Sequence, residues 1–172
     1  MAVDTKRHVS VALVVSTMLL FGSCGGSSPS SPTSPSAAPA PTPVYPSMVG
    51  VWTGNLSNTN SGDISGSYTC PYQFSISSQT QGTFGGTFFQ QQSSDANCVG
   101  RSGTLTGSVS TAGGATVTPV GGTNPICTPQ GSIAWSGNVS GGRTMFLSRT
   151  YTDSCTGGFT VRRTQNLSLT KQ

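Results

Sequence analysis

Four polar side chains near the C-terminus have the types and spacing best suited to ligand binding. They stand at alternate positions of two stretches, in phase with the apolar residues, and they are Arg149, Tyr151, Arg163 and Gln165. An arginine that faces a core is unfavourable unless it is paired or meets a wet cavity. Guanidinium groups bind carboxylates and phosphates. The pattern therefore predicts a site for an anionic group, unless a bulge or a register slip turns both arginines to solvent.

Four cysteines form an even set once Cys24 is considered apart. Cys70, Cys98, Cys127 and Cys155 are 28, 29 and 28 residues apart, which are not metal-ligand spacings. The only histidine is His8. In an oxidising compartment the four predict two disulfides, with three possible connectivities.

Catalysis has few candidate groups in this chain. Glu is absent, and outside the N-terminal segment the carboxylates are Asp63, Asp95 and Asp153. We expect no enzyme, cofactor or metal, because the usual general bases are missing. Two alternatives for the three aspartates are a shared calcium ion and ordinary Asx residues in loop turns.

The stretches that position these residues are short, alternating and glycine-punctuated, as in antiparallel all-β domains. No stretch has a helical period. The eight expected strands are 49–57, 68–78, 83–91, 102–110, 115–119, 132–139, 143–151 and 159–170.

The expected connections alternate between tight and long. Those at 79–82, 111–114 and 140–142 are short and contain glycine, as hairpin turns do. Those at 58–67, 92–101, 120–131 and 152–158 are long and lie at one end of a meander, where all four cysteines also fall. This arrangement favours the pairings Cys70–Cys98 and Cys127–Cys155.

Eight such strands close into an up-and-down barrel or fold as a two-sheet sandwich. The opening Gly50-Val51-Trp52 resembles the G-x-W signature of lipocalins and related calycin barrels, where the tryptophan plugs the closed end. That resemblance implies a barrel, although the arginine that usually covers the tryptophan is not apparent. Arg149-Thr150-Tyr151 also resembles the R-x-Y of fatty-acid-binding barrels in the calycin group. Alternatively, Trp52 is simply the largest core residue of a β domain.

Alternation predicts which residues face inward. The apolar set is Trp52, Leu56, Cys70, Tyr72, Phe74, Ile76, Phe84, Phe88, Leu105, Val109, Ile133, Trp135, Val139, Met145, Leu147, Val161, Leu167 and Leu169. Glycines share this phase, for example Gly103 and Gly107, and permit close approach of aromatic rings or leave a cavity. The outward positions are mostly Ser, Thr, Asn and Gln, which argues for a soluble body.

The N-terminal segment predicts location. Residues 1–23 have a positive start and a short apolar run, as a signal peptide does. Phe21-Gly22-Ser23-Cys24 resembles the lipobox of bacterial lipoproteins, in which the cysteine becomes lipidated and N-terminal. Residues 24–47 read as a Pro/Ser-rich linker and 48–172 as the domain. Gly25 in place of Asp implies outer-membrane sorting if the source is Gram-negative.

Two functions remain open at this stage. The first is a lipid-anchored, non-enzymatic envelope protein that binds a small amphipathic or anionic ligand in the barrel; an interior packed solid between Trp52, Phe74 and Trp135 would oppose it. The second is a structural or interaction module whose disulfide-stapled loops contact envelope glycan or protein. The net charge of +3 after residue 23 (six basic, three acidic) is too small and scattered for nucleic acid.

Overall fold

The computed structural model describes residues 38–122 and 126–172, which form an all-β structure. The strands are β1 (Gly50–Gly62), β2 (Gly66–Thr80), β3 (Thr83–Gln90), β4 (Arg101–Val109), β5 (Gly114–Gly121), β6 (Cys127–Gln130), β7 (Trp135–Ser140), β8 (Thr144–Cys155) and β9 (Thr160–Lys171). Within the described ranges there is no helix, and so none that could cross a membrane.

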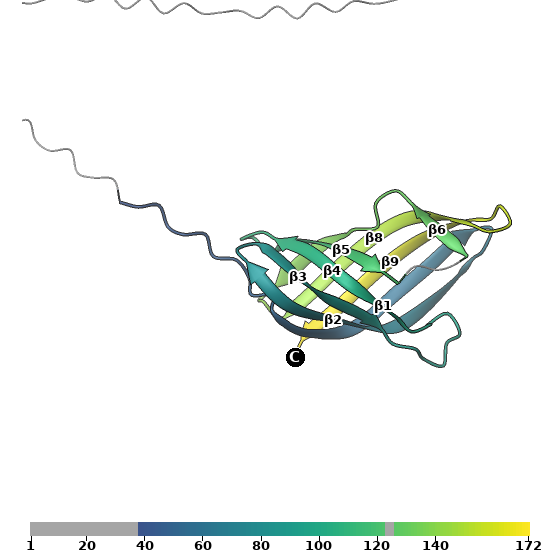
Figure 1. The fold of residues 1–172 in the computed structure, drawn as a ribbon, viewed down its shortest axis with the longest axis horizontal. Helices are drawn as coiled ribbons and strands as arrows, with labels where there is room; N and C mark the ends of the chain where they lie inside the picture. The colour runs from purple at the N-terminus through teal and green to yellow at the C-terminus, as the bar shows by residue number, and fades with distance from the viewer. Residues whose placement is uncertain (1–37, 123–125) are drawn as a thin grey trace, which may run out of the picture. The chain divides into compact units, whose positions relative to one another are not determined.

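Neighbouring strands pair antiparallel in the order β6-β8-β7-β5-β4-β3-β2-β1-β9, and a further pairing of β8 with β9 closes the ring (Figure 1). The result is an eight-stranded up-and-down barrel with one extra strand, which confirms the predicted barrel over the sandwich. The extra strand β6 and the ring strand β7 both pair with the same edge of β8. β7 pairs with residues 144–148 of β8, and β6 pairs with residues 152–155. The 120–131 region, expected to be a loop, therefore contains a strand.

Two further expected loops are largely strand. β1 and β2 stay paired through Asn60↔Gly66, which leaves a turn only around residues 63–65 of the expected 58–67 loop. β8 likewise continues to Cys155, beyond its expected end at residue 151. Inward polar residues fill these extensions, as described below, so the apolar alternation used to find strands stops before the strands do.

The barrel interior is packed from the tight-turn end. Trp52, Phe74 and Trp135 are fully buried, and the ring centroids of Phe74 and Trp135 lie 6.1 Å apart. Phe84 and Phe88 face Gly107 and Gly103 across the β3–β4 pair. A Cβ on Gly107 would lie 2.3 Å from Phe84 Cζ, so the missing side chain makes room for the ring, as predicted. Of the expected apolar core residues only Ile133 is not fully buried.

Trp52 occupies the tight-turn end of the barrel. Its indole Nε1 donates to the Met48 carbonyl at 2.7 Å, and Lys171 Nζ lies 5.6 Å from its ring centroid and donates to the Ser47 carbonyl. Lys171 thus supplies the cation over the signature tryptophan. Gly50 leaves space for it, because a Cβ there would lie 2.9 Å from Lys171 Cε.

The last residues of the expected linker also belong to this end. Tyr45 packs against the core cluster, Met48 is fully buried, and Gln79 bonds to the backbone of both Pro46 and Met48. Residues 45–48 therefore pack onto this end of the barrel.

Two disulfides join Cys70 to Cys98 and Cys127 to Cys155, as predicted. The first ties β2 to the β3–β4 connection. The second joins register partners on β6 and β8, so it links two strands and not two loops.

Candidate functional site

The four polar residues singled out in the sequence come from one pair of strands. Arg149 faces Gln165, and Tyr151 faces Arg163, across the β8–β9 ladder. All four line one cavity of about 90 Å³ inside the barrel, on the side of the disulfides. They point inward, as the alternation predicts, because β8 and β9 run without a bulge through this region.

Arg149 is held by an aromatic ring and two hydrogen bonds. Its guanidinium carbon lies 3.7 Å from the Trp135 ring centroid and 5.0 Å from that of Tyr151. Nε donates to Gln165 Oε1 at 2.6 Å, and Nη1 donates to the Ile133 carbonyl. Burial lowers the pKa of Arg149, against the opposing effects of Tyr151, Tyr72 and Asp153.

Arg149 has donors to spare. A guanidinium carries five N–H groups, and those two hydrogen bonds use only two of them. In the described part of the chain no carboxylate forms an ion pair with it; the ion pair there is between Arg163 and Asp153. Arg149 is therefore a partly buried cation whose remaining donors are available to an acceptor in the cavity.

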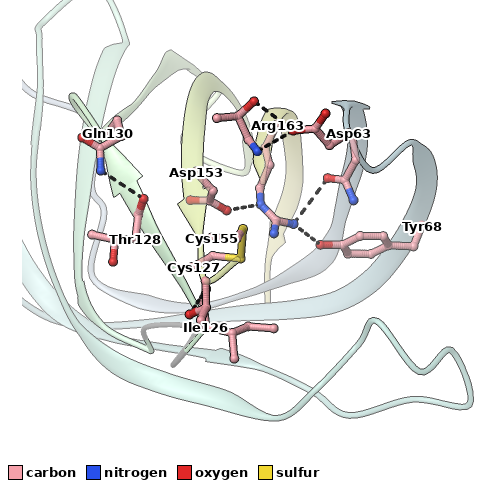
Figure 2. The surroundings of a disulfide bond; sticks show 12 residues. Asp63, Tyr68, Ile126, Cys127, Thr128, Gln130, Asp153, Cys155 and Arg163 are labelled. Carbon is pink, nitrogen blue, oxygen red and sulfur yellow. Dashed lines mark hydrogen bonds and ion pairs between the residues drawn. A yellow bond between two sulfur atoms is a disulfide. The ribbon is translucent and has the colours of Figure 1, made fainter. Parts of the chain in front are cut away.

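In the described structure Arg163, unlike Arg149, forms an ion pair with a carboxylate, that of Asp153. Nε donates to Asp153 Oδ2, and Nη1 donates to Asn60 Oδ1 at 3.3 Å and to the Tyr68 hydroxyl at 3.4 Å (Figure 2). Burial acts to lower the pKa of Arg163, but the hydrogen bond and the charge of Asp153 outweigh it, so that the pKa is raised. This arginine stays charged and its geometry is set by three partners.

An amide chain connects the two arginines and was not anticipated. Gln165 Nε2 donates to Asn58 Oδ1 at 2.9 Å, and Asn58 Nδ2 donates to Asn60 Oδ1 at 2.6 Å. Asn58 and Asn60 lie on the β1 extension, which was expected to be loop. The signal that could have found them is the continued alternation after Leu56, in which asparagines take the inward positions.

The cavity is cationic. Its charged lining residues are Arg101, Arg149, Arg163 and Asp153, three positive and one negative, for a formal charge of +2. Tyr72 and Tyr151 border it as well, and neither hydroxyl has a hydrogen-bond partner within the described ranges. Burial raises the pKa of both phenols, so they remain protonated donors at neutral pH.

The cavity is also small. Ligand sites for drug-sized molecules are about 300–1,000 Å³, so a volume of about 90 Å³ suits a compact ion. Deeper in the barrel the space is filled by Trp52, Phe74 and Trp135. The Trp135 indole N–H, beneath Arg149, is buried without a hydrogen-bond partner in the described structure. An apolar tail has no room in this interior.

The three aspartates do not form a metal site. Asp63 accepts from the Thr160 backbone N–H at 2.8 Å, and Asp95 accepts from Asn97 in the β3–β4 connection. Asp153, expected in a loop, is a buried residue of β8 paired with Arg163. Among residues 38–122 and 126–172, no three His, Cys, Asp or Glu side chains gather as metal ligands would. The calcium alternative is therefore wrong for this part of the chain.

The predicted signal peptide and the lipidation position Cys24 lie outside the described residues. No protein-family model matches this chain, and no curated protein matches it.

Proposed function

We propose that this chain is a lipid-anchored protein of the bacterial cell envelope, without catalytic activity, whose barrel binds one small oxyanion at the disulfide end. The ligand is a carboxylate or phosphate group, free or as the head of a larger molecule that extends outward. The lipid anchor at Cys24 and the outer-membrane location rest on the N-terminal sequence.

The observation that carries the binding proposal is Arg149. It is a partly buried cation without a carboxylate partner in the described structure, it keeps three N–H groups unused, and it borders a cavity of formal charge +2. A buried cation of this kind is expensive without an anion. Tyr72 and Tyr151 add two protonated hydroxyls at the same cavity, which suit an oxyanion with several acceptor oxygens.

The interior is packed between Trp52, Phe74 and Trp135, which opposes an amphipathic ligand held within the barrel, so the proposal is limited to a small anion in the cavity at the disulfide end. The interior beyond the cavity is filled by aromatic residues, so a fatty-acid tail cannot lie along the barrel axis as in larger calycin barrels. Any apolar part of a ligand must stay at the mouth.

The test is a titration of the full chain, in mild detergent and with both disulfides formed, with phosphate, acetate and chloride. Indole fluorescence and NMR report on Trp135, which lies beneath Arg149. We expect phosphate or acetate to bind and Arg149→Gln to weaken binding by roughly tenfold or more, the value of a charge-assisted hydrogen bond. Binding should weaken with salt.

Arg162→Gln is the matched control, because Arg162 is the exposed outward neighbour of Arg163 on β9. Arg149→Lys keeps the charge and should retain part of the affinity. Equal binding by the wild-type and Arg149→Gln proteins, both folded by circular dichroism, contradicts the proposal. So does an indole signal that responds to chloride as strongly as to phosphate.

A second candidate function, contact with envelope glycan or protein through the loops, draws on exposed apolar side chains at the disulfide end. Ile64, Val99 and Phe159 stand on three different connections and are 50%, 43% and 51% exposed. Replacing Ile64 and Phe159 by Ser should abolish capture of an envelope partner while anion binding remains. If Arg149→Gln abolishes capture of the envelope partner and the loop substitutions do not, the proposal that the loops make the contact is rejected.

A further inference from the structure

The outer face of β1, β9, β8 and β7 carries two aligned rows of uncharged side chains. In the first row Asn55, Ser168, Phe146 and Asn138 are successive register partners across the four strands; in the second, Ser57, Asn166, Ser148 and Ser136 are. Neighbouring strands lie about 4.8 Å apart, so each row spans about 14 Å. All eight side chains line a shallow hollow of about 380 Å³.

The polar members of these rows are free to bind. They are exposed, and none of the seven has a hydrogen-bond partner in the described structure. Asn side chains offer both donors and acceptors, and Ser hydroxyls do the same. The hollow therefore presents mixed hydrogen-bonding groups at a spacing that the sheet fixes.

Phe146 is the aromatic residue among them. Its side chain is 58% exposed, although large apolar residues of β8 such as Met145 and Leu147 are buried. Its register partners on the neighbouring strands are Ser168 and Asn138, which are too small to cover the ring. A bare aromatic ring in a polar hollow offers an apolar platform surrounded by hydrogen-bonding groups.

We propose that this outer face binds a neutral oligosaccharide. A pyranose ring has an apolar C–H face that packs on an aromatic ring and a rim of hydroxyls that exchange hydrogen bonds with Asn and Ser. The length of the rows suits a few sugar units.

The lining of the hollow disfavours the other occupants. None of its residues is charged, so an ionic ligand or nucleic acid finds no counter-charge. A protein interface would need a larger apolar centre than one Phe. The surface lies on the outward side of β8 and β9 and is separate from the inward cavity of Arg149 and Arg163.

The test is a titration of the full chain with cellohexaose, maltohexaose and hexa-N-acetylchitohexaose, followed by calorimetry and amide NMR. We expect at least one of them to bind and to shift amides of Asn138, Phe146 and Asn166. Phe146→Ala should reduce affinity roughly tenfold or more, as loss of a central aromatic contact does. Phe146→Trp should retain binding.

Phe89→Ala is the matched control, since Phe89 is a 46% exposed aromatic on the outside of β3 and does not line the hollow. It should bind like the wild type. The proposal is overturned if none of the three oligosaccharides binds at millimolar concentration, or if Phe89→Ala and Phe146→Ala weaken binding equally. It is also overturned if Phe146→Ala abolishes self-association of a chain that binds no saccharide, because the face would then pair two copies.

Discussion

Arg149 illustrates how a single residue keeps its charge in a mostly enclosed position. The face of Trp135 replaces part of its water shell, and Gln165 and Ile133 satisfy two donors without neutralising it. Arg163 on the next strand is instead matched by a carboxylate. The two arginines were equivalent in the sequence pattern, and their surroundings in the described structure differ: Arg163 holds the polar network together, whereas Arg149 keeps three N–H groups unused.

At the same scale, Tyr72 and Tyr151 should ionise late. Burial raises the pKa of both phenols above the usual value of about 10, so the folded protein retains protons that the unfolded chain loses. Their contribution to stability is complete below pH 10 and is lost as the pH rises further. The lowered pKa of Arg149 acts in the opposite sense. The ionisation of the tyrosines is measured directly by absorbance titration near 295 nm.

We expect Tyr72 and Tyr151 to form a late-titrating group, with Tyr72→Phe and Tyr151→Phe each removing part of it. In denaturant both phenols should titrate near pH 10. Phenylalanine variants that leave the late group unchanged would show that these hydroxyls are solvated.

At the scale of elements, the β8–β9 pair and the β1 extension form one polar structure. Gln165 bridges Arg149 of β8 to Asn58 of β1, and Asn60 of β1 accepts from Arg163. These bonds run across three neighbouring strands, so the register of each strand depends on the others. At the mouth of the barrel, polar side chains thus hold the strands in register, as apolar packing does deeper in the barrel.

Removing one partner of the buried ion pair should therefore be costly. The side chains of Arg163 and Asp153 are only 15% and 5% exposed. Arg163→Met leaves the Asp153 carboxylate without its cation and should lower the free energy of unfolding by about 3–5 kcal/mol. Denaturant titration of the oxidised protein measures it.

The control is Arg162→Met on the outer side of β9, which should change stability by no more than about 0.5 kcal/mol. Adding Asp153→Asn to Arg163→Met should recover part of the loss, because the uncompensated charge is then gone. Equal stability of the Arg162→Met and Arg163→Met proteins would mean that water reaches the Arg163–Asp153 ion pair.

At the scale of the whole molecule, the ladders of β7 are the shortest in the barrel ring, with four residue pairs to β5 and five to β8. β5 and β7 share four residue pairs, from Gly114↔Asn138 to Val117↔Trp135, whereas β8–β9 and β1–β2 share eleven each. The half of β5 beyond Val117 has no partner on that side in the described structure, because β6 bonds to β8. The barrel should open first along β5–β7.

Native-state hydrogen exchange with mass spectrometry tests this expectation. Amides of residues 114–117 and 135–138 should exchange faster than those of the β1–β2 pair, since fewer ladder bonds must break to open them. The Cys70–Cys98 bridge ties β2 to the β3–β4 connection and does not cross the β5–β7 pair. Earlier exchange in β1–β2 would place the weak point elsewhere.

While a two-sheet sandwich, other cysteine connectivities and a register slip stayed open, the amino-acid sequence by itself favoured the barrel, the tight turns, both disulfide pairings and the inward phase of Arg149 and Arg163. All of these follow from short-range regularities: a period of two, glycine turns, and cysteines that recur with the long connections. Solvent-facing and core-facing positions differ in polarity over most strands, so alternation is readable there.

The remaining features depend on contacts between strands that are distant in the sequence. The ends of β1 and β8, the strand β6 and the burial of Asp153 depend on polar residues that face inward because partners on other strands satisfy them. Lys171 reaches Trp52 across 119 positions of the chain. The cavity size follows from how six aromatic side chains from the four strands β1, β2, β3 and β7 fill a common space. Pairwise sequence patterns carry no information about the volume that remains.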